Sequence, residues 1–389
     1  MQRVYLDNAA TTRVLPEVID AMLPCYSEVY GNPSSVHSFA QDAHKAMDES
    51  RAAVARALNA SSPDEIIFTG GGSEGDNMIL RGIASAYKRK GKHVITSAIE
   101  HHAVLHTLAA MEIEGLVEVT TLPVDEYGLI SLEELENAIR PDTILVSIMY
   151  ANNEMGTIEP IREIGAVCKK HGVLFHTDAV QAVGHIPVDV QADNIDLLTL
   201  TAHKFHGPKG IGAVYVKKGV RLPAMILGGG QERKKRAGTE NVPGMVGLAT
   251  ALTLQMERMD DVSAKMRCLR DKMIANIAEN IPYVKLNGHP EKRLPNNVNF
   301  SIKYIEGESI LLMLDLNGIA ASSGSACTSG SLDPSHVLLA MGLDHETAHG
   351  SLRMTLSEFT TEEEVDYVLD LLPKIVKRLR AMSPLYKED

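Results

Sequence analysis

The stretch FTGGGSEGDN (residues 68–77) joins the end of a predicted strand to the start of a predicted helix through a glycine-rich turn. The apolar run 65–69 predicts the strand, and Gly70, Gly72 and Gly75 match the spacing G-x-G-x-x-G. Such a unit presents unpaired backbone N–H groups and the positive end of a helix dipole. The stretch therefore predicts an α/β fold with an anion site at this turn.

Short apolar runs alternate with helical patterns from about residue 16 to about residue 250. The further runs lie at 93–96, 143–148, 173–176, 197–200 and 213–216. Several are apolar without alternation, which is expected where helices cover both faces of a sheet. This spacing predicts βα units around a mainly parallel sheet flanked by helices.

After about residue 250 the pattern becomes that of a smaller α+β domain. A charged amphipathic helix is predicted at about 256–280, and a final helix begins near Thr361 in the sequence TEEE. The elements predicted between them are strands at 297–302 and 351–357 and helices near 307–316 and 333–341. We predict a large domain over 15–255 and a small domain formed by 1–14 and 256–389.

Length, composition and charge exclude several classes of protein. A chain of 389 residues is long enough for two domains, and no apolar run approaches the roughly 20 residues that span a bilayer. The N-terminus lacks the pattern of a secretion signal, so we expect a cytoplasmic protein without a membrane segment. A net charge of −12 disfavours nucleic acid as a partner. The basic run 233–236 is typical of a solvated loop, with an anion contact for whichever residue faces a site.

Four cysteines stand at positions 25, 168, 268 and 327 without C-x-x-C spacing, which indicates reduced thiols rather than disulfides or a zinc site. Cys168 and Cys268 fall in predicted helices and Cys25 in an apolar segment, so we interpret these three as inert structural thiols. Cys327 differs because Ser, Ala, Thr and Gly surround it in a predicted exposed loop at about 322–332. A thiol that moves between a bound cofactor and an outside acceptor needs such a tether.

The glycine turn alone leaves the bound group open. A nicotinamide dinucleotide requires an acid at the end of the next strand, and Glu100 stands about 25 residues after Gly75. A nucleotide-binding loop of the Walker type is excluded because no Gly-Lys-Ser/Thr follows. Other residues must therefore decide between a dinucleotide and another phosphate.

Lys204 and Asp178 follow two successive apolar runs, where α/β sheets place their ligands. Partial burial would lower the pKa of Lys204 and free its amine to form a Schiff base. Asp178 would keep the ring nitrogen of pyridoxal phosphate protonated, as that cofactor requires. Alone, Lys204 is typical of an exposed strand end and Asp178 of a helix cap. Together with the glycine turn they meet three demands of one cofactor.

Histidine and asparagine residues near the same strand ends add to this site. His101 is suited to stack on a pyridine ring or to transfer protons. His102 and His106 are spaced like a metal pair, but without a third ligand we interpret them as surface histidines and predict no metal site. Asn152 and Asn153 either bond a ring hydroxyl or form a loop turn.

Taken together, these residues resemble the cysteine desulfurases of the NifS and IscS type, which are fold-type-I pyridoxal phosphate enzymes. The resemblance runs nearly end to end and is therefore far more specific than a glycine pattern. Its motifs are YLDNAATT (5–12), GNPSSVHSFA (31–40), EHHAVL (100–105), ANNEMGT (151–157), HTDAVQAVG (176–184), TAHKFHGPKGIG (201–212), RAGTEN (236–241), SSGSACTSG (322–330) and the stretch around Arg353.

The resemblance implies a role for each matching residue. Lys204 would carry the Schiff base, Asp178 would face the pyridine nitrogen and His101 would stack on the ring. The phosphate would lie between Gly72, Ser73, Thr201 and His203, with Thr239 reaching it from the second subunit of a homodimer. The ring oxygen would contact Asn153 and Gln181, and the substrate carboxylate would contact Asn32 and Arg353. A guanidinium matches a carboxylate in a bidentate way.

The resemblance also implies a reaction. L-cysteine would become L-alanine, its sulfur would pass to Cys327 as a persulfide, and an iron–sulfur scaffold protein of the NifU or IscU kind would receive it. Lys204 would remove the α-proton and His101 would transfer a proton. Other hypotheses remain open at this stage: a selenocysteine lyase, an aminotransferase, a nicotinamide oxidoreductase, or a sulfur carrier without catalysis.

Two stretches depart from the family pattern. Family members commonly read TSGATES where this chain has TGGGSEG (69–75), so Ser73 stands in place of a threonine and Gly75 in place of a serine. The common S-x-H-K begins here with Thr201. Both Ser73 and Thr201 retain a hydroxyl donor, so we expect phosphate binding to survive. We also expect Gly72→Ala and Gly75→Ser to preserve or tighten cofactor binding.

Overall fold

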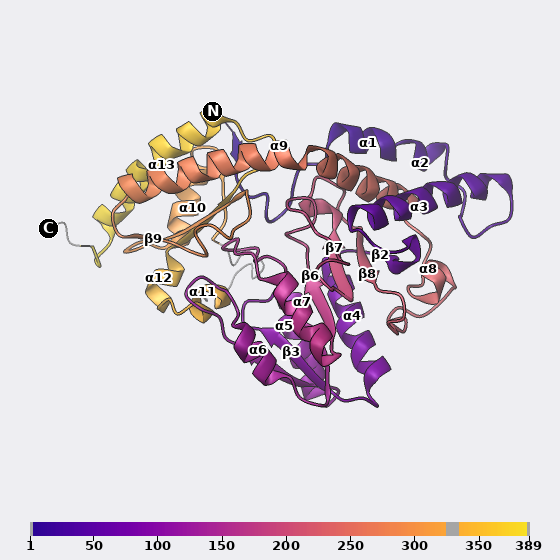
Figure 1. Cartoon of the computed structure of the whole chain (residues 1–389). Helices are drawn as coiled ribbons and strands as arrows, with labels where there is room; N and C mark the ends of the chain where they lie inside the picture. The colour runs from indigo at the N-terminus through magenta and orange to yellow at the C-terminus, as the bar shows by residue number, and fades with distance from the viewer. Residues whose placement is uncertain (1–2, 324–333, 387–389) are drawn as a thin grey trace.

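The computed structural model describes residues 3–323 and 334–386. Its elements form two lobes, and the long helix α9 (Val242–Asn280) runs along both of them (Figure 1). The larger lobe is built around a seven-stranded sheet and the smaller one around a three-stranded sheet. The fold is therefore mixed α/β, as the sequence predicts.

The large sheet is mainly parallel. Its strands, in spatial order, are β2 (Ile66–Thr69), β8 (Gly212–Val216), β7 (Leu197–Thr201), β6 (Leu174–Asp178), β5 (Thr143–Ser147), β3 (His93–Ser97) and β4 (Glu118–Leu122). Only β8 runs antiparallel to both of its neighbours. The six predicted runs all form strands of this sheet, and β4 is an addition.

Helices lie on both faces of the large sheet. The helices of the large lobe are α1 (Pro16–Met22), α2 (Pro24–Ser27), α3 (Ser38–Ala57), α4 (Gly72–Tyr87), α5 (His102–Ile113), α6 (Leu132–Ala138), α7 (Ile161–His171) and α8 (Gln231–Lys234), with short 3-10 turns η1 (Pro63–Glu65) and η2 (Ala202–Lys204). Of these, α3 to α7 contact strands of the sheet. Phe68 and Leu198 belong to one apolar cluster, and their chain neighbours Ile67 and Leu197 belong to another. Because successive side chains of a strand point to opposite faces, both faces of this sheet are buried.

The smaller lobe combines a short sheet with helices. Its strands are β9 (Val284–Leu286), β10 (Asn297–Ile302) and β12 (Ser351–Thr355), which are antiparallel, and β1 (Val4–Tyr5) paired with β11 (Ile319–Ala320). Its helices are α10 (Gly307–Asp315), α11 (His336–Ala340), α12 (His345–His349) and α13 (Glu362–Met382). Val4 and Leu6 pack in the same apolar cluster as Phe300 and Leu352, so the N-terminal strand lies in this lobe.

The helix α9 begins earlier than the sequence predicts. The side chain of Asn241 accepts a hydrogen bond from the N–H of Gly244, and Pro243 lies in the first turn, so capping starts the helix at Val242. The predicted division between residues 255 and 256 falls inside this continuous helix, and the domain boundaries stay a prediction. In the described part of the chain, no helix combines the length and apolarity that crossing a membrane requires.

Candidate active site

The candidate site lies at the carboxyl ends of the central parallel strands. Asp178 ends β6, Thr201 ends the neighbouring strand β7, and Lys204 lies in the 3-10 turn η2 that follows. Ligands of open α/β sheets bind at this edge. The fold thus brings the predicted Lys204 and Asp178 to adjacent strand ends.

The glycine turn forms one wall of a pocket beside these residues. Helix α4 begins at Gly72, with Gly71 as its cap, and a pocket of about 560 Å³ lies at that helix start. The predicted phosphate residues Gly72, Ser73, Thr201 and His203 all line this pocket. Backbone N–H groups at a helix start, hydroxyls and an imidazole are a donor set that suits a phosphate.

Glu74 and Arg236 flank this pocket as an ion pair. Their side chains are joined at 2.9 Å, and Glu74 also accepts a hydrogen bond from the N–H of Gly70 at 3.0 Å. Glu74 lines the pocket, so its charge would face a bound phosphate if Arg236 did not neutralise it. Arg236 is thus the member of the predicted basic run that lies beside the site. Arg233 instead pairs with Asp64 on the surface.

Asp178 is buried at the end of β6. Its Oδ1 atom accepts a hydrogen bond from the N–H of Val180 at 2.9 Å, and only 6 % of the residue is exposed. Burial raises the pKa of the Asp178 carboxyl to about 6, while the hydrogen bond and the nearby charge of Lys204 lower it. A cation beside this carboxyl, such as a pyridinium, would favour its charged form.

The N-terminal segment holds Lys204. The Nζ atom donates hydrogen bonds to the main-chain oxygens of Ala9 at 2.6 Å and Ala10 at 2.8 Å. Gln181 donates to the same oxygen of Ala9 at 3.0 Å, and a ring nitrogen of His203 lies 3.3 Å from the hydroxyl of Thr11. Lys204, Gln181 and His203 therefore all contact the segment 9–11.

His101 caps the helix α5. Its Nδ1 atom accepts a hydrogen bond from the N–H of Ala103 at 3.1 Å, which assigns the proton of the neutral ring to Nε2. Burial and the charge of Lys204 lower the pKa of His101 to about 4. The ring is therefore neutral at physiological pH, with one N–H to donate.

Asn152 and Asn153 have different roles. The side chain of Asn152 is buried, donates to the main-chain oxygen of Ile99 at 2.9 Å and accepts from the N–H groups of Glu154 and Met155. Asn152 therefore shapes the turn, which was one of the two sequence hypotheses. Asn153 is half-buried, and its main-chain oxygen accepts from Arg353 at 3.0 Å.

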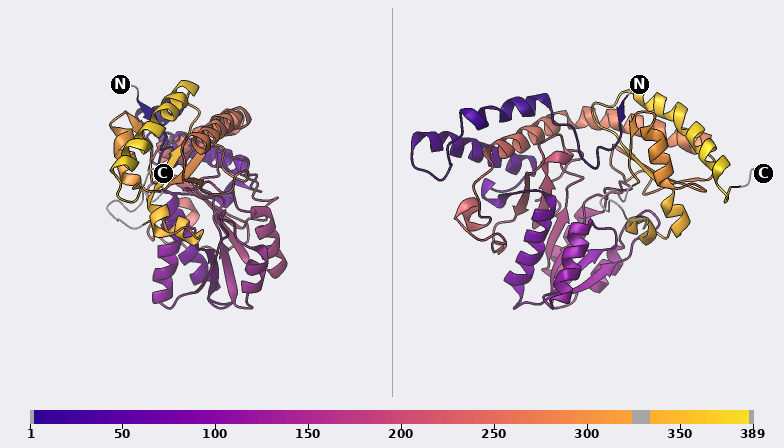
Figure 2. Two further views of the ribbon diagram at one scale, coloured as in Figure 1. Left: turned by 90° about the vertical axis from the view of Figure 1, so that its left-hand side faces the viewer. Right: turned by 180° about the vertical axis from the view of Figure 1, so that it is seen from behind.

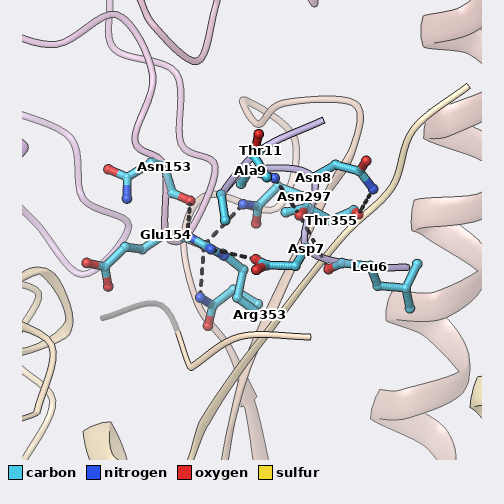
Figure 3. Close-up of polar contacts among 12 residues, drawn as sticks. Leu6, Asp7, Asn8, Ala9, Thr11, Asn153, Glu154, Asn297, Arg353 and Thr355 are labelled. Atoms are coloured by element: carbon cyan, nitrogen blue, oxygen red, sulfur yellow. Dashed lines mark hydrogen bonds and ion pairs between the residues drawn. The ribbon is translucent and has the colours of Figure 1, made fainter. Parts of the chain in front are cut away.

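Arg353 lies on β12 with 2 % of its surface exposed. Its Nη2 atom pairs with Oδ1 of Asp7 at 2.9 Å, and Figure 3 shows the guanidinium between Asp7 and Asn153. The Nε atom is buried and has no hydrogen-bond partner among the residues that the structure describes. The arginine is thus fixed on two sides and retains an unused donor.

Two predicted residues lie apart from this group. Asn32 is exposed in the segment 28–37 between α2 and α3, at the opposite end of the molecule from α13 (Figure 2). Arg353 belongs to β12 of the small lobe, as α13 does, so one subunit does not bring the segment 28–37 to it. Thr239 is exposed and does not line the pocket of its own subunit. Cys327 lies outside the described residues.

The remaining cysteines and histidines have these surroundings. Cys25 and Cys168 are buried, as expected of structural thiols, but Cys268 is exposed because it lies on the outer side of α9. The rings of His102 and His106 stack at 4.6 Å. Within 3–323 and 334–386, no group of three or more His, Cys, Asp or Glu side chains is arranged to hold a metal ion.

Sequence reasoning missed two features of this site. The segment 7–11 supplies the Asp7 carboxylate and the main-chain oxygens that hold Lys204, although only its place in a family motif was recognised. Glu74 lies in the glycine turn itself, but its ion pair with Arg236 spans 162 positions of the chain. The run YLDNAATT was the available signal, and no local rule assigns it a role.

The chain matches a known protein family over nearly its whole length. The family model described as aminotransferase class-V matches residues 4–368, so the chain belongs to that family. It is 57 % identical over 389 residues to the cysteine desulfurase IscS of Clostridium botulinum strain Hall, covering all of this chain and 98 % of that protein. Within the class-V family, the chain therefore belongs to the cysteine desulfurases.

Solved structures of similar proteins have the same fold as this chain. A NifS-like protein superimposes with a TM-score of 0.91 at 40 % identity, covering 97 % of this chain and 100 % of the other. A structure described as SspA in complex with cysteine has a TM-score of 0.81 at 36 % identity, with 92 % and 100 % covered. The predicted family and fold class are thereby confirmed.

Proposed function

We propose that this cysteine desulfurase uses pyridoxal 5'-phosphate to convert L-cysteine to L-alanine and transfers the sulfur to Cys327 as a persulfide. The observation that carries the proposal is the placement of Lys204 beside Asp178 at adjacent strand ends, with the glycine pocket next to them. A lysine, a buried acid and a phosphate pocket are the groups that this cofactor requires.

The described residues fit the cofactor. Its phosphate would lie in the pocket lined by Gly72, Ser73, Thr201 and His203, where donors converge. A Cβ atom at Gly72 would lie 3.0 Å from Val180, so the glycine allows the start of α4 to pack closely against the segment that follows Asp178. Asp178 would pair with the ring nitrogen, His101 would lie against the ring, and Asn153 and Gln181 would contact its oxygen. Thr239 of a second subunit would complete the phosphate site.

The residues of the chain divide the chemistry between them. When bound, pyridoxal phosphate supplies an aldehyde for amines and a ring that stores an electron pair. Lys204 Nζ takes the α-proton of cysteine, because the turn η2, directly after β7, holds this amine at the site. Ala9 and Ala10 accept hydrogen bonds from that amine and stabilise its protonated form. His101, neutral with its proton on Nε2, moves a second proton.

Sulfur transfer uses Cys327. Its thiolate attacks the sulfur of the substrate, the C–S bond breaks as the S–S bond forms, and protons return to the carbon chain to give alanine. Arg353, with Asn32 supplied by a second subunit, holds the substrate carboxylate. The segment 28–37, which carries Asn32, lies at the opposite end of one subunit from the small lobe, which carries Arg353 on β12 (Figure 2). This arrangement supports a homodimer, because the proposed carboxylate site is incomplete without the partner.

The proposal extends to the sulfur acceptor, the cellular location, the domain bounds and the alternative substrate. The sulfur acceptor is an iron–sulfur scaffold protein of the NifU or IscU kind, and the enzyme works in the cytoplasm. Residues 15–255 form the cofactor domain, while 1–14 and 256–389 form the small domain. Selenocysteine is the alternative substrate, because every residue named above would serve it equally.

Sulfide and alanine formation tests the proposal. Purified protein with L-cysteine and a thiol reductant should form both products in equal amounts and show the visible absorbance of bound pyridoxal phosphate. Cys327→Ala should lose sulfide formation, and Cys268→Ala serves as its matched control because that cysteine is exposed on α9. Persistent sulfide formation by Cys327→Ala would contradict the persulfide, and a parent without the absorbance would contradict the cofactor.

A further inference from the structure

The contact between Asp7 and Arg353 has no role in the reaction proposed above. A buried guanidinium is costly unless an acid pairs with it, and among the described residues Asp7 forms that ion pair. The side chain of Asp7 is 22 % exposed, whereas that of Arg353 is 2 % exposed. The pair therefore stands at the border between the protein interior and the site (Figure 3).

Asp7 is held rigidly. It forms a bridge with Thr355 of β12, and its main-chain oxygen accepts from the N–H of Ala10 at 3.0 Å. The next residues are fixed too, because Asn8 donates to the main-chain oxygen of Thr355 at 2.7 Å and Ala9 donates to its hydroxyl at 2.8 Å. An aspartate in such a turn is suited to orient a partner rather than to swing away from it.

The guanidinium is held on two of its three nitrogens. Asp7 engages Nη2 with a single oxygen, and the main-chain oxygen of Asn153 engages Nη1. These two fixed oxygens define the plane of the group. Within residues 3–323 and 334–386 the buried Nε–H has no hydrogen-bond partner, although buried donors are almost always paired. A carboxylate of the substrate would be an acceptor for it.

We infer that Asp7 is a positioning residue for substrate recognition: it orients Arg353 so that the remaining guanidinium donors receive the α-carboxylate of the amino-acid substrate. This inference rests on the proposed function, in which Arg353 binds that carboxylate. The segment 7–10 thereby links two parts of the site, since Asp7 orients the arginine and the oxygens of Ala9 and Ala10 hold Lys204.

Two variants distinguish positioning from competition. Asp7→Ala removes the oxygen on Nη2, whereas Asp7→Asn retains an oxygen there and removes the charge. If Asp7 positions Arg353, Asp7→Ala should raise KM for L-cysteine about tenfold, with kcat within about twofold, and Asp7→Asn should restore most of the affinity. If Asp7 instead competed with the substrate for Arg353, both variants would lower KM, and that result would overturn the inference.

A ligand without a carboxylate supplies the second readout. The absorbance of the bound cofactor should be titrated with L-cysteine and with cysteamine, which lacks the carboxylate. We expect Asp7→Ala to weaken the binding of L-cysteine and to leave the binding of cysteamine unchanged. Equal weakening of the binding of both ligands would overturn the inference. Asp64→Ala, which removes an exposed aspartate paired with Arg233, is the matched control. A parent that forms no sulfide would contradict the proposed function, while the ratio of the two affinities still tests Asp7.

Discussion

The Nζ atom of Lys204 lies 2.6 Å from the main-chain oxygen of Ala9, although 195 positions separate the two residues. Ala9 is itself fixed, because its N–H donates to the hydroxyl of Thr355 at 2.8 Å. The small lobe, which contains Thr355, therefore sets the position of a lysine on the large lobe. This contact makes the N-terminal segment part of the site.

Removing the hydroxyl that fixes Ala9 should impair both stability and turnover. In Thr355→Val the N–H of Ala9 is left buried without a partner, which costs roughly 1–3 kcal/mol. We expect a lower free energy of unfolding in denaturant and a lower kcat. Thr121→Val, at an exposed position of β4, should change neither quantity. An unchanged kcat in Thr355→Val would show that Ala9 does not help to place Lys204.

The ion pair between Arg236 and Glu74 should set cofactor affinity. Arg236→Ala leaves the carboxylate of Glu74 facing the phosphate, and the repulsion should weaken binding of pyridoxal phosphate about tenfold. Glu74→Gln removes the negative charge and should bind the cofactor as well as the parent or better. Equilibrium dialysis of the cofactor measures both affinities, with Lys234→Ala as a control at the exposed last residue of α8. Weaker binding in Glu74→Gln would contradict this account.

The packing around Gly72 and Gly75 predicts the stability of the two variants that the sequence expects to keep cofactor binding. A Cβ atom at Gly75 would lie 2.8 Å from Thr199 and 2.9 Å from Val214, so Gly75→Ser overpacks the contact between α4 and the sheet. Overpacking of this kind costs roughly 1–3 kcal/mol. At Gly72 the nearest atom would be 3.0 Å away, on Val180, so Gly72→Ala should be milder. Denaturant unfolding measures the loss of stability in each variant, and we expect the larger loss in Gly75→Ser. Equal stability of the two variants would refute this expectation.

Glu159 should make the protein less stable as the pH rises. Burial raises the pKa of this carboxyl from 4.5 to about 8, and in the described part of the chain its Oε1 atom has no hydrogen-bond partner. Between pH 4.5 and 8 the folded protein therefore keeps a proton on Glu159 that the unfolded chain has already released. The stabilisation is complete below pH 4.5 and is lost toward pH 8, by up to about 1.4 kcal/mol per pH unit.

Glu159→Gln should flatten that pH dependence in thermal unfolding between pH 5 and 8. Part of the slope should remain, because burial also raises the pKa of Glu100 to about 8. Glu163→Gln, at an exposed position of α7, should keep the full slope. If Glu159→Gln and the parent have the same slope, the carboxyl is charged in the folded protein.

Local patterns predicted the elements of the fold well. The strand β10 has the predicted bounds, and α13 begins with the predicted capping box between Thr361 and Glu364. These elements follow from periodicity and capping, which depend on neighbouring residues. The antiparallel direction of β8 was not predicted, because an apolar run is the same in either direction.

The site was predicted in part. The structure gathers Lys204, Asp178 and the glycine pocket, which lie at strand ends that the sequence indicates. The contacts of Asp7 with Arg353 and of Ala9 with Lys204 join positions far apart in the chain. The first forms within the small lobe and the second forms where the two lobes meet, so no local pattern indicates either. The predicted roles of Thr239, Asn32 and Cys327 stay predictions, since the first two require a second subunit and the third lies outside the described residues.

Alanine formation from L-cysteine by Lys204→Ala tests the central claim most directly. The matched control is Lys217→Ala. Lys217 is an exposed lysine directly after β8, and it forms an ion pair with Asp196. Both proteins should be loaded with pyridoxal phosphate and assayed beside the parent. We predict that Lys204→Ala forms no alanine above the uncatalysed rate while Lys217→Ala matches the parent. Alanine formation by Lys204→Ala at the parental rate would contradict the assignment of the catalytic lysine.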